Sequence, residues 1–283
     1  MTPFRSLYFV TAIATVTLGL TAVRVAAQPS LPDAMAALRS GDAARAAEIA
    51  TEWLEHQGDS AGHAHWVRGK AREELGDFAG AIDDYRFVTR VVPNEPGVLL
   101  ALGAASFKNA EMERSISAFD SAARLDRGLE ARLWQRGIAH YYARQFTDGA
   151  RQFEIHRTVN PEDVENSVWH FLCVAASDGA EAARSGLIPV SHDRRSPMME
   201  ILSLFRGESD PSKVLDAAEK ASGNEQASPP MFYAHLYLGL YYEAIGEPAV
   251  SAEHIGKAVG FDLPHDYMWQ VARVHRKLRA DTE

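Results

Sequence analysis

Cysteine is nearly absent from the 283-residue sequence, and this scarcity limits the chemistry that the chain can carry. Cys173 stands alone, within the apolar run from Trp169 to Ala175. A single thiol excludes an internal disulfide and a zinc site built from several cysteines. Because an isolated cysteine usually packs as a small hydrophobic side chain, we expect Cys173 to be buried rather than reactive.

Basic residues are also in short supply. The sequence has 29 Lys and Arg against 38 Asp and Glu, a formal net charge of −9. Arg5 and Arg24 are the only charged residues before Gln28, so the rest of the chain has 29 − 2 = 27 basic residues against 38 acidic ones, or −11. Phosphate binding requires clustered Lys and Arg. We therefore expect no nucleic acid partner, and the charge is equally unfavourable for an anionic membrane surface.

Strings of catalytic residues are missing too. No His-Glu-x-x-His, Gly-x-Ser-x-Gly or phosphate-loop string occurs. His63 and His65 would diverge on a helix, so they do not indicate a metal site. The adjacent residues Ser191, His192 and Asp193 cannot adopt the geometry of a catalytic triad. We predict that the chain is not an enzyme and has no cofactor, metal or small-molecule substrate. A hydrolase of wall polymers stays as a third hypothesis, which would need ionisable groups converging in a pocket.

A 34-residue repeat is the main feature that the sequence does contain. Gly69, Gly103 and Gly137 are 34 residues apart (103 − 69 and 137 − 103). The same step relates three further sets of residues: Phe78, Met112 and Phe146; Ile82, Ile116 and Ala150; Tyr85, Phe119 and Phe153. A period of 34 with these small and aromatic positions is typical of the tetratricopeptide repeat, a pair of antiparallel helices.

Local signals around Gly76 indicate how each pair is built. Gly76 tolerates the left-handed conformation that ends a helix, and Asp77 can cap the next one. The second helix has apolar residues at i, i+3, i+4 and i+7, namely Phe78, Ala81, Ile82 and Tyr85. Pro93 ends that helix. Each pair leaves a second apolar face that only a neighbouring pair can cover, so such units occur in stacks.

These signals predict an all-α fold, a right-handed α-solenoid of tetratricopeptide helix hairpins with a C-terminal capping helix. We expect a single solenoid over 28–283, beginning with a degenerate pair over 31–57. Its regular repeats are predicted over 62–95, 96–129, 130–163 and 232–265, with an irregular helical insert over 164–231. Arg68 and Arg136 depart from the motif, which prefers Leu there.

Charged residues on the predicted helices are expected to be solvated. The acidic pairs Glu73-Glu74 and Asp83-Asp84 lie on helices with no feature that would visibly perturb them. The final helix, over 265–279, has a basic end that suits a polar cap and the negative end of the helix dipole: Arg273, Arg276, Lys277 and Arg279.

Residues 1–27 are similar to a secretory signal peptide. Arg5 gives a positive start, and the stretch 7–23 is uncharged and mostly apolar. Val25-Ala26-Ala27 then offers small residues for cleavage before Gln28. We predict an exported protein, periplasmic if the source is a Gram-negative bacterium. The alternative is an inner-membrane anchor formed by the uncleaved segment, because its apolar run approaches the ~18–20 residues of a membrane span.

Beyond the repeat, the order of parts carries a more specific signal. It comprises Phe119-Asp120-Ser121, Arg136-Gly-Ile-Ala-His-Tyr-Tyr142, a Trp169 helix after Pro161, an irregular insert, and Tyr237-Leu-Gly-Leu-Tyr-Tyr242 with its terminal helix. Over about residues 66–278 this order resembles the Nlp-type envelope lipoproteins, which are periplasmic tetratricopeptide adaptors. The resemblance implies an all-helical protein, a possible homodimer, that brings cell-wall hydrolases to a periplasmic protease and to wall-building complexes. The lipid-bearing cysteine of that family is absent here, so lipid attachment is excluded.

In tetratricopeptide folds the first helix of each pair lines a concave groove. Carried onto this sequence, the groove positions are His63, Trp66, Lys70, Glu73, Glu74, Leu100, Ala104, Phe107, Lys108, Ala131, Trp134, Ile138, Tyr141 and Tyr142. We predict that the partner-binding residues among them are Trp66, Lys70, Leu100, Phe107, Lys108, Trp134, Ile138 and Tyr141. Aromatic anchors with scattered positive charge suit a peptide or protein segment. The alternative is that Trp134 and Ile138 only pack on the flanking repeat.

Two functions fit these observations. The first is a non-enzymatic exported adaptor that binds envelope proteins through the concave groove, with cell-wall hydrolases or a periplasmic protease as the implied partners. The alternative is a structural component of a secretion or pilus assembly, which contacts its partners through the outer faces and the 186–197 loop. Arg194 and Arg195 are the residues of that loop most suited to such a contact.

Overall fold

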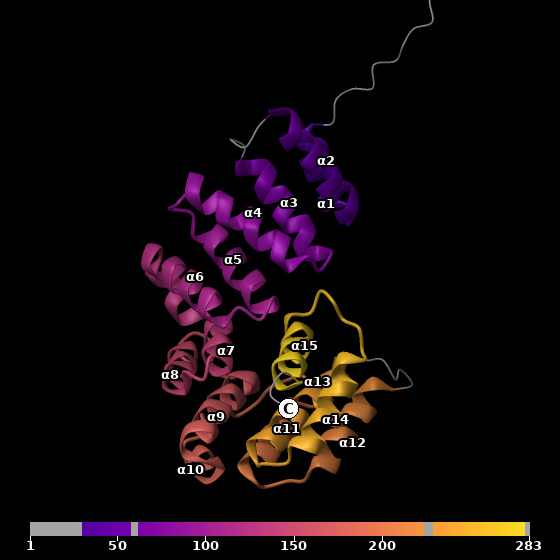
Figure 1. Cartoon of the computed structure of the whole chain (residues 1–283). Coiled ribbons are helices and arrows are strands. Elements are labelled where there is room, and N and C mark those ends of the chain that lie inside the picture. The colour runs from indigo at the N-terminus through magenta and orange to yellow at the C-terminus, as the bar shows by residue number, and fades with distance from the viewer. Residues whose placement is uncertain (1–29, 58–61, 224–228, 281–283) are drawn as a thin grey trace, which may run out of the picture.

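The computed structural model describes residues 30–57, 62–223 and 229–280, and every regular element in these ranges is a helix (Figure 1). The helices of the N-terminal half are α1 (Leu31–Arg39), α2 (Ala43–Gln57), α3 (Gly62–Glu74), α4 (Phe78–Val91), α5 (Pro96–Lys108) and α6 (Met112–Leu125). They are followed by a 3-10 helix, η1 (Arg127–Arg132), and by α7 (Trp134–Tyr142), α8 (Phe146–His156), α9 (Val164–Asp178) and α10 (Ala180–Ser185). The last five are α11 (Met198–Arg206), α12 (Pro211–Ser222), α13 (Pro229–Ala244), α14 (Pro248–Val259) and α15 (Tyr267–Ala280). The prediction of an all-α solenoid of helix hairpins is confirmed.

The glycines of the 34-residue repeat are explained by where the second helix places its aromatic ring. A Cβ atom added to Gly69 would lie 2.7 Å from Cε1 of Tyr85. The equivalent distances are 2.8 Å from Gly103 to Cε1 of Phe119 and 2.6 Å from Gly137 to Cζ of Phe153. Contacts this short leave no room for a methyl group. The absent side chain therefore lets the two helices of each pair approach closely, with the ring buried between them.

The third regular repeat, predicted over 130–163 and formed by α7 and α8, differs from the prediction in its first helix. Its first helix, α7, begins at Trp134 and has 9 residues, whereas α3 and α5 have 13 each. The preceding residues form η1 because the Asp126 side chain accepts a hydrogen bond from the backbone N–H of Gly128 at 2.8 Å. Leu133 then breaks the helical path with φ −86° and ψ 57°. The shorter α7 leaves room beside it for another element.

The predicted irregular insert, 164–231, is helical in its described part and packs into the core of the protein. Helices α9 to α12 join α13, α14 and α15 in one hydrophobic cluster that extends from Phe107 to Val274. Cys173 lies inside this cluster with no exposed surface, and burial raises the pKa of its thiol. The first two pairs, in contrast, are held by small separate clusters around Ile49 and Ile82.

The chain turns back on itself after α10. In Figure 1 the pairs from α1 to α10 form a curved array, and α11 to α15 lie beside its lower part. As a result α15 lies on the inner side of the bend, between α7 and α13 and below α5 (Figure 1). The predicted leader, 1–27, lies outside the described residues. Across the parts that are described, no helix is both long and apolar enough to span a membrane.

Candidate protein-binding surface

The C-terminal helix α15 covers part of the concave surface that the repeats create. Tyr267, its first residue, stacks on Phe107 of α5 with ring centroids 5.6 Å apart. The same ring meets Trp134 of α7 edge to face at 5.1 Å. Aromatic pairs at these distances contribute beyond their buried area. The inner face of α5 and α7 is thus occupied by a helix of the chain itself.

Polar contacts fix α15 against α7 and α13. Glu243 of α13 accepts hydrogen bonds from Tyr141 at 3.0 Å and from Arg279 at 2.7 Å. Nε2 of His275 lies 2.9 Å from the same carboxylate, and its Nδ1 lies 3.1 Å from the hydroxyl of Tyr142. Burial by itself would raise the pKa of Glu243, but the hydrogen bonds from His275 and Arg279 outweigh it and hold that pKa well below its usual range. The expectation of a solvated cap is therefore wrong for Arg279.

The predicted groove residues that lie under α15 are buried or half-buried. Phe107, Ile138 and Tyr141 are buried at 0%, 0% and 5% exposure. Trp134 is half-buried, and it packs on Tyr267 of α15. Their contact with a partner stays a prediction. What the structure shows is that these four side chains form the seat of α15 and the core beneath it.

Lys108 and Leu100 lie at the edge of this seat. Nζ of Lys108 is 2.6 Å from Glu73 and lies over the ring of Tyr267. Leu100 is half-buried against the cluster around Phe119. Both residues are therefore committed largely to intramolecular contacts, and a partner would meet them only at their exposed edges.

The other half of the concave surface, over α1 and α3, is open. Lys70 is 37% exposed and lies over the ring of Trp66 at 5.9 Å, and His63 is exposed beside them. Gly41 and Gly76 end α1 and α3 at equivalent turns 35 residues apart (76 − 41), and the same offset makes Met35 equivalent to Lys70. Met35 is 41% exposed. Trp66 is half-buried and packs on the clusters around Ile49 and Ile82, so only part of its ring faces solvent here, beside Met35 and one positive charge.

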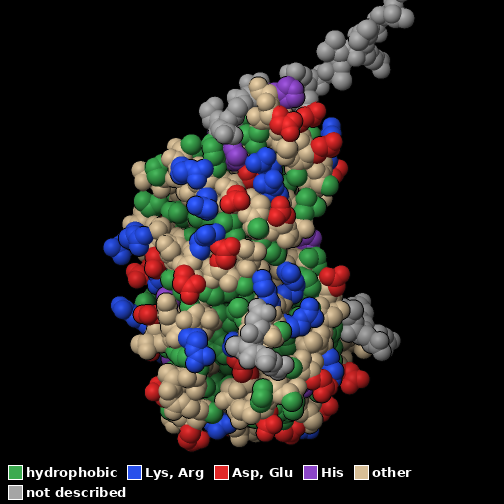
Figure 2. Space-filling view, viewed as in Figure 1, with side chains coloured by type: hydrophobic (Ala, Val, Ile, Leu, Met, Phe, Trp, Pro, Cys, Tyr) green, Lys and Arg blue, Asp and Glu red, His purple; other side chains and the backbone are tan. Residues whose placement is uncertain are grey.

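A basic rim adjoins this open half. Arg273, Arg276 and Lys277 of α15 line a hollow of about 340 Å³ together with Lys108. Figure 2 shows Lys and Arg side chains gathered over α15 on this face. The guanidinium of Arg273 also lies over the ring of Phe78 at 5.8 Å, which turns this edge of α15 toward the α3–α4 pair. The rim supplies positive charge in a chain that is acidic as a whole.

The ion pairs buried around Asp84 were not predicted from the sequence. Asp84 is 1% exposed and accepts hydrogen bonds from Arg68 and Arg72, each at 2.7 Å, with His65 at the same distance. The expectation of a solvated Asp84 is therefore wrong. The available signal was Arg68, a cation at a position where the motif prefers an apolar residue. A cation buried there requires a carboxylate partner.

Glu73 was also expected on a solvated face and is not. Its carboxylate accepts hydrogen bonds from Lys108 at 2.6 Å, Tyr85 at 2.8 Å and Lys70 at 3.2 Å. Burial would raise its pKa, but the charges of Lys108 and Lys70 outweigh that and lower it. Glu73 thus joins α3 to α5 at the centre of the concave side.

The 186–197 loop is tied to the start of α9. Arg195 pairs with Asp163 at 2.7 Å, Glu165 at 2.5 Å and Asp193 at 2.6 Å. Ser191 Oγ lies 3.2 Å from His192, but Asp193 is held by Arg195, so these residues form no catalytic relay. Throughout the described ranges, no group of three or more His, Cys, Asp or Glu is placed to hold a metal ion.

The comparisons agree with this geometry. The tetratricopeptide repeat family model matches residues 32–86 and 68–130. The matched stretch corresponds to helices α1 to α6. A tetratricopeptide repeat protein from Parabacteroides merdae has a similar fold, with a TM-score of 0.58, 15% identity, and coverage of 88% of this chain and 97% of that one. The pilF protein of Pseudomonas aeruginosa aligns with a TM-score of 0.46, 12% identity, and coverage of 87% and 95%.

Tetratricopeptide geometry also accounts for the division of the groove. The inner helices α1, α3, α5 and α7 all contribute to one concave side. Helix α15 lies over α5 and α7 but leaves α1 and α3 uncovered. Among the described residues, the part of this concave side that α15 leaves uncovered is therefore its N-terminal half, bordered by the basic rim of α15.

Proposed function

We propose that this protein is a non-enzymatic adaptor that binds a segment of another protein on the open half of its concave surface. The observation that carries this proposal is α15. It is an amphipathic helix seated in the groove through Tyr267 on Phe107 and Trp134, and this intramolecular packing supports a helical or extended segment as the ligand of these inner faces. The open half, with Met35, Trp66 and the basic rim, offers the same combination of apolar anchors and charge.

Export is a further part of the proposal. It depends on the signal-like residues 1–27 and on the resemblance to the Nlp-type adaptors, which also suggests envelope proteins as partners and a possible homodimer. The mass of the protein isolated from fractionated cells would test it, since cleavage before Gln28 removes 27 residues. A chain that keeps its leader and stays with the inner membrane would support the anchored alternative instead.

The alternative of a pilus or secretion component acting through the 186–197 loop receives less support. Arg195 is committed to Asp163, Glu165 and Asp193, so reversing its charge would disturb the loop itself. Arg194 is exposed and remains available for that test. Loss of partners from Arg194→Glu alone, with the fold intact, would favour the loop over the groove.

Partner capture after crosslinking tests the adaptor directly. We expect Met35→Lys combined with Trp66→Ala to reduce the recovery of the specific partners at least tenfold, because both anchors of the open half are lost. Leu125→Lys is the matched control, since Leu125 is also an exposed apolar residue, at 44%, but lies at the end of α6, the outer helix of its pair. Equal recovery of partners by the groove variant and the control, with unchanged circular dichroism spectra, would show that the groove does not bind the partners.

A further inference from the structure

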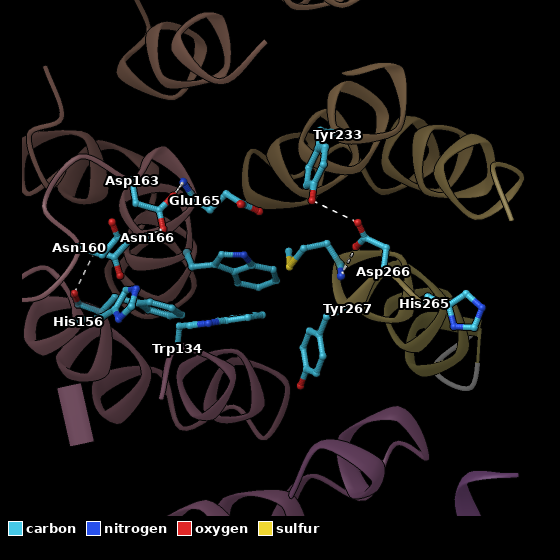
Figure 3. A pocket seen from close by; sticks show the side chains of 13 residues that line it. Trp134, His156, Asn160, Asp163, Glu165, Asn166, Tyr233, His265, Asp266 and Tyr267 are labelled. Carbon is cyan, nitrogen blue, oxygen red and sulfur yellow. Dashed lines mark hydrogen bonds between the residues drawn. The ribbon is translucent and has the colours of Figure 1, made fainter. Parts of the chain in front are cut away.

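A second concave feature lies on the other side of α15, where the array and the last helices meet. It is a cavity of about 460 Å³. Trp134 of α7, His156 of α8 and Asp163 and Glu165 at the start of α9 line one side. Figure 3 shows these residues facing Tyr233 of α13 and the Asp266–Tyr267 segment across the space. The cavity is therefore built from three segments that are far apart in sequence.

The walls of this cavity combine aromatic rings with negative charge. Trp134, Trp169, Tyr233 and Tyr267 all contribute to its lining. Rings of this kind attract a cation placed over their faces, most strongly when water is excluded. The lining also includes three carboxylates, those of Asp163, Glu165 and Asp266. Such a combination favours a positively charged guest.

The carboxylates are not equally engaged. Asp163 and Glu165 already hold the guanidinium of Arg195, which shows that this wall accepts an arginine. Asp266 accepts hydrogen bonds from the backbone N–H groups of Met268 and Trp269 and, at 3.4 Å, from Tyr233. Among the described residues no basic side chain forms an ion pair with it, so Asp266 is the carboxylate that is left for a ligand.

Three buried polar atoms of the lining residues have no partner within the described protein. They are Oδ1 of Asn166, an acceptor, Nε1 of Trp169, a donor, and the hydroxyl of Tyr267. Asn166 and Trp169 are 3% and 2% exposed. Buried polar groups in folded proteins are almost always hydrogen-bonded, so this wall leaves a donor and an acceptor that a polar guest would satisfy once the wall shifts enough to expose them. A metal ion could be coordinated by Oδ1 of Asn166 but would offer no acceptor to the N–H of Trp169, and a quaternary ammonium would satisfy neither atom.

We propose that this cavity binds an arginine or lysine residue of a partner polypeptide, with Asp266 as its counter-ion. The cation lies against the rings of Tyr233, Tyr267 and Trp134, while the polypeptide around it can accept from Trp169 and donate to Asn166. This inference deepens the adaptor function, because it assigns the chemistry of one residue in the partner. It concerns the C-terminal side of the molecule and is independent of the open half over α1 and α3.

The indole resonances of the ¹⁵N-labelled protein offer a direct test. The sequence has 5 Trp, so the spectrum contains few indole signals, and the Trp169 signal is assigned by its loss in Trp169→Phe. The probe is Nα-acetyl-arginine N-methylamide, compared with its neutral citrulline isostere. We expect a saturable shift of the Trp134 and Trp169 signals with the arginine probe, and at least tenfold weaker binding of citrulline. The signal of Trp53, in α2, should not move.

Asp266→Asn separates charge from structure. Asn caps a helix as well as Asp does, so the start of α15 should be retained while the counter-ion is lost. We expect at least a tenfold loss of affinity for the arginine probe. Asp210→Asn is the matched control, because Asp210 caps α12 in the same way, with its side chain accepting from Ser212 N, and does not line the cavity. Equal affinity in Asp266→Asn and wild type would overturn the proposal, as would equal binding of citrulline and arginine.

A ring variant keeps the proposal testable if Asp266→Asn fails to fold. Tyr233→Leu removes a ring that lines the cavity. Tyr241→Leu removes a ring of the same helix that packs on Phe205 and does not line the cavity. Only the first should weaken the probe. The probe measures binding to the cavity without any partner. Absence of probe binding would therefore not contradict a capture of partners that depends on the groove, and loss of partner capture would not contradict binding of the probe to the cavity.

Discussion

The ring that each second helix places over a glycine of the first helix sets the approach of the two helices. Phe119 is 1% exposed, and its Cε1 would lie 2.8 Å from a Cβ on Gly103. We expect Phe119→Ala to lower the free energy of unfolding by about 3–5 kcal/mol, because a large buried ring leaves a cavity that cannot collapse. Urea denaturation would measure this. Leu125→Ala, at an exposed residue, should stay within about 0.5 kcal/mol. A loss of less than about 1 kcal/mol in Phe119→Ala would contradict this packing.

The turn between the two helices of a pair requires a left-handed residue, and one pair meets that requirement without glycine. Ala110 has φ 68° at the position where Gly76 has φ 79°. A Cβ in this conformation costs about 1–2 kcal/mol, part of which the larger chain entropy of glycine offsets. Ala110→Gly should therefore raise the free energy of unfolding by about 0.5–1 kcal/mol, and Gly76→Ala should lower it. Thermal denaturation of both variants checks the pair, and two shifts of the same sign would contradict the argument.

At the scale of single elements, most helices follow from local signals. Gly76, Asp77 and Pro93 marked the ends of α3 and α4 because each acts on the backbone beside it. The late start of α7 could not be read in the same way. It depends on the Asp126 cap and on the space that α15 needs against Trp134. The second helices, in contrast, begin at the repeat positions Phe78, Met112 and Phe146.

The site was less readable than the helices because it depends on contacts between distant residues. Phe107 and Tyr267 are 267 − 107 = 160 positions apart, and nothing near either one indicates that they stack. Tetratricopeptide geometry predicted Trp66 and Lys70 on the concave side; in the structure Lys70 is 37% exposed and Trp66 is half-buried against the clusters around Ile49 and Ile82, and their contact with a partner stays a prediction. That geometry could not show that α15 would cover the neighbouring positions at Trp134 and Tyr141.

The attachment of α15 should depend on pH. The pKa of Glu243 is lowered from its ordinary value of 4.5, so its ion pairs stabilise the fold above that value and lose their effect as the pH falls through the lowered pKa. Glu243→Gln should cost about 1–3 kcal/mol at pH 7, since charged hydrogen bonds from His275 and Arg279 are lost. Its melting temperature should also fall less than that of wild type between pH 6 and pH 3. Parallel melting curves for the two proteins over this range would contradict the assignment.

For the molecule as a whole, the distribution of the core predicts unequal local stability. The cluster from Phe107 to Val274 includes side chains from α5 through α15, whereas the clusters around Ile49 and Ile82 are small and join only neighbouring pairs. In repeat proteins each unit depends on its neighbours, and a terminal unit has only one. We expect hydrogen exchange to be fastest in α1 and α2, intermediate in α3 and α4, and slowest in α9 and α13. Mass spectrometry of exchange under native conditions measures this order, with Ile49→Ala accelerating exchange in α1 and α2 while leaving α13 unchanged. Uniform protection from α1 to α13 would mean that the N-terminal pairs unfold together with the rest, and the open half of the groove would then be as rigid as the half beneath α15.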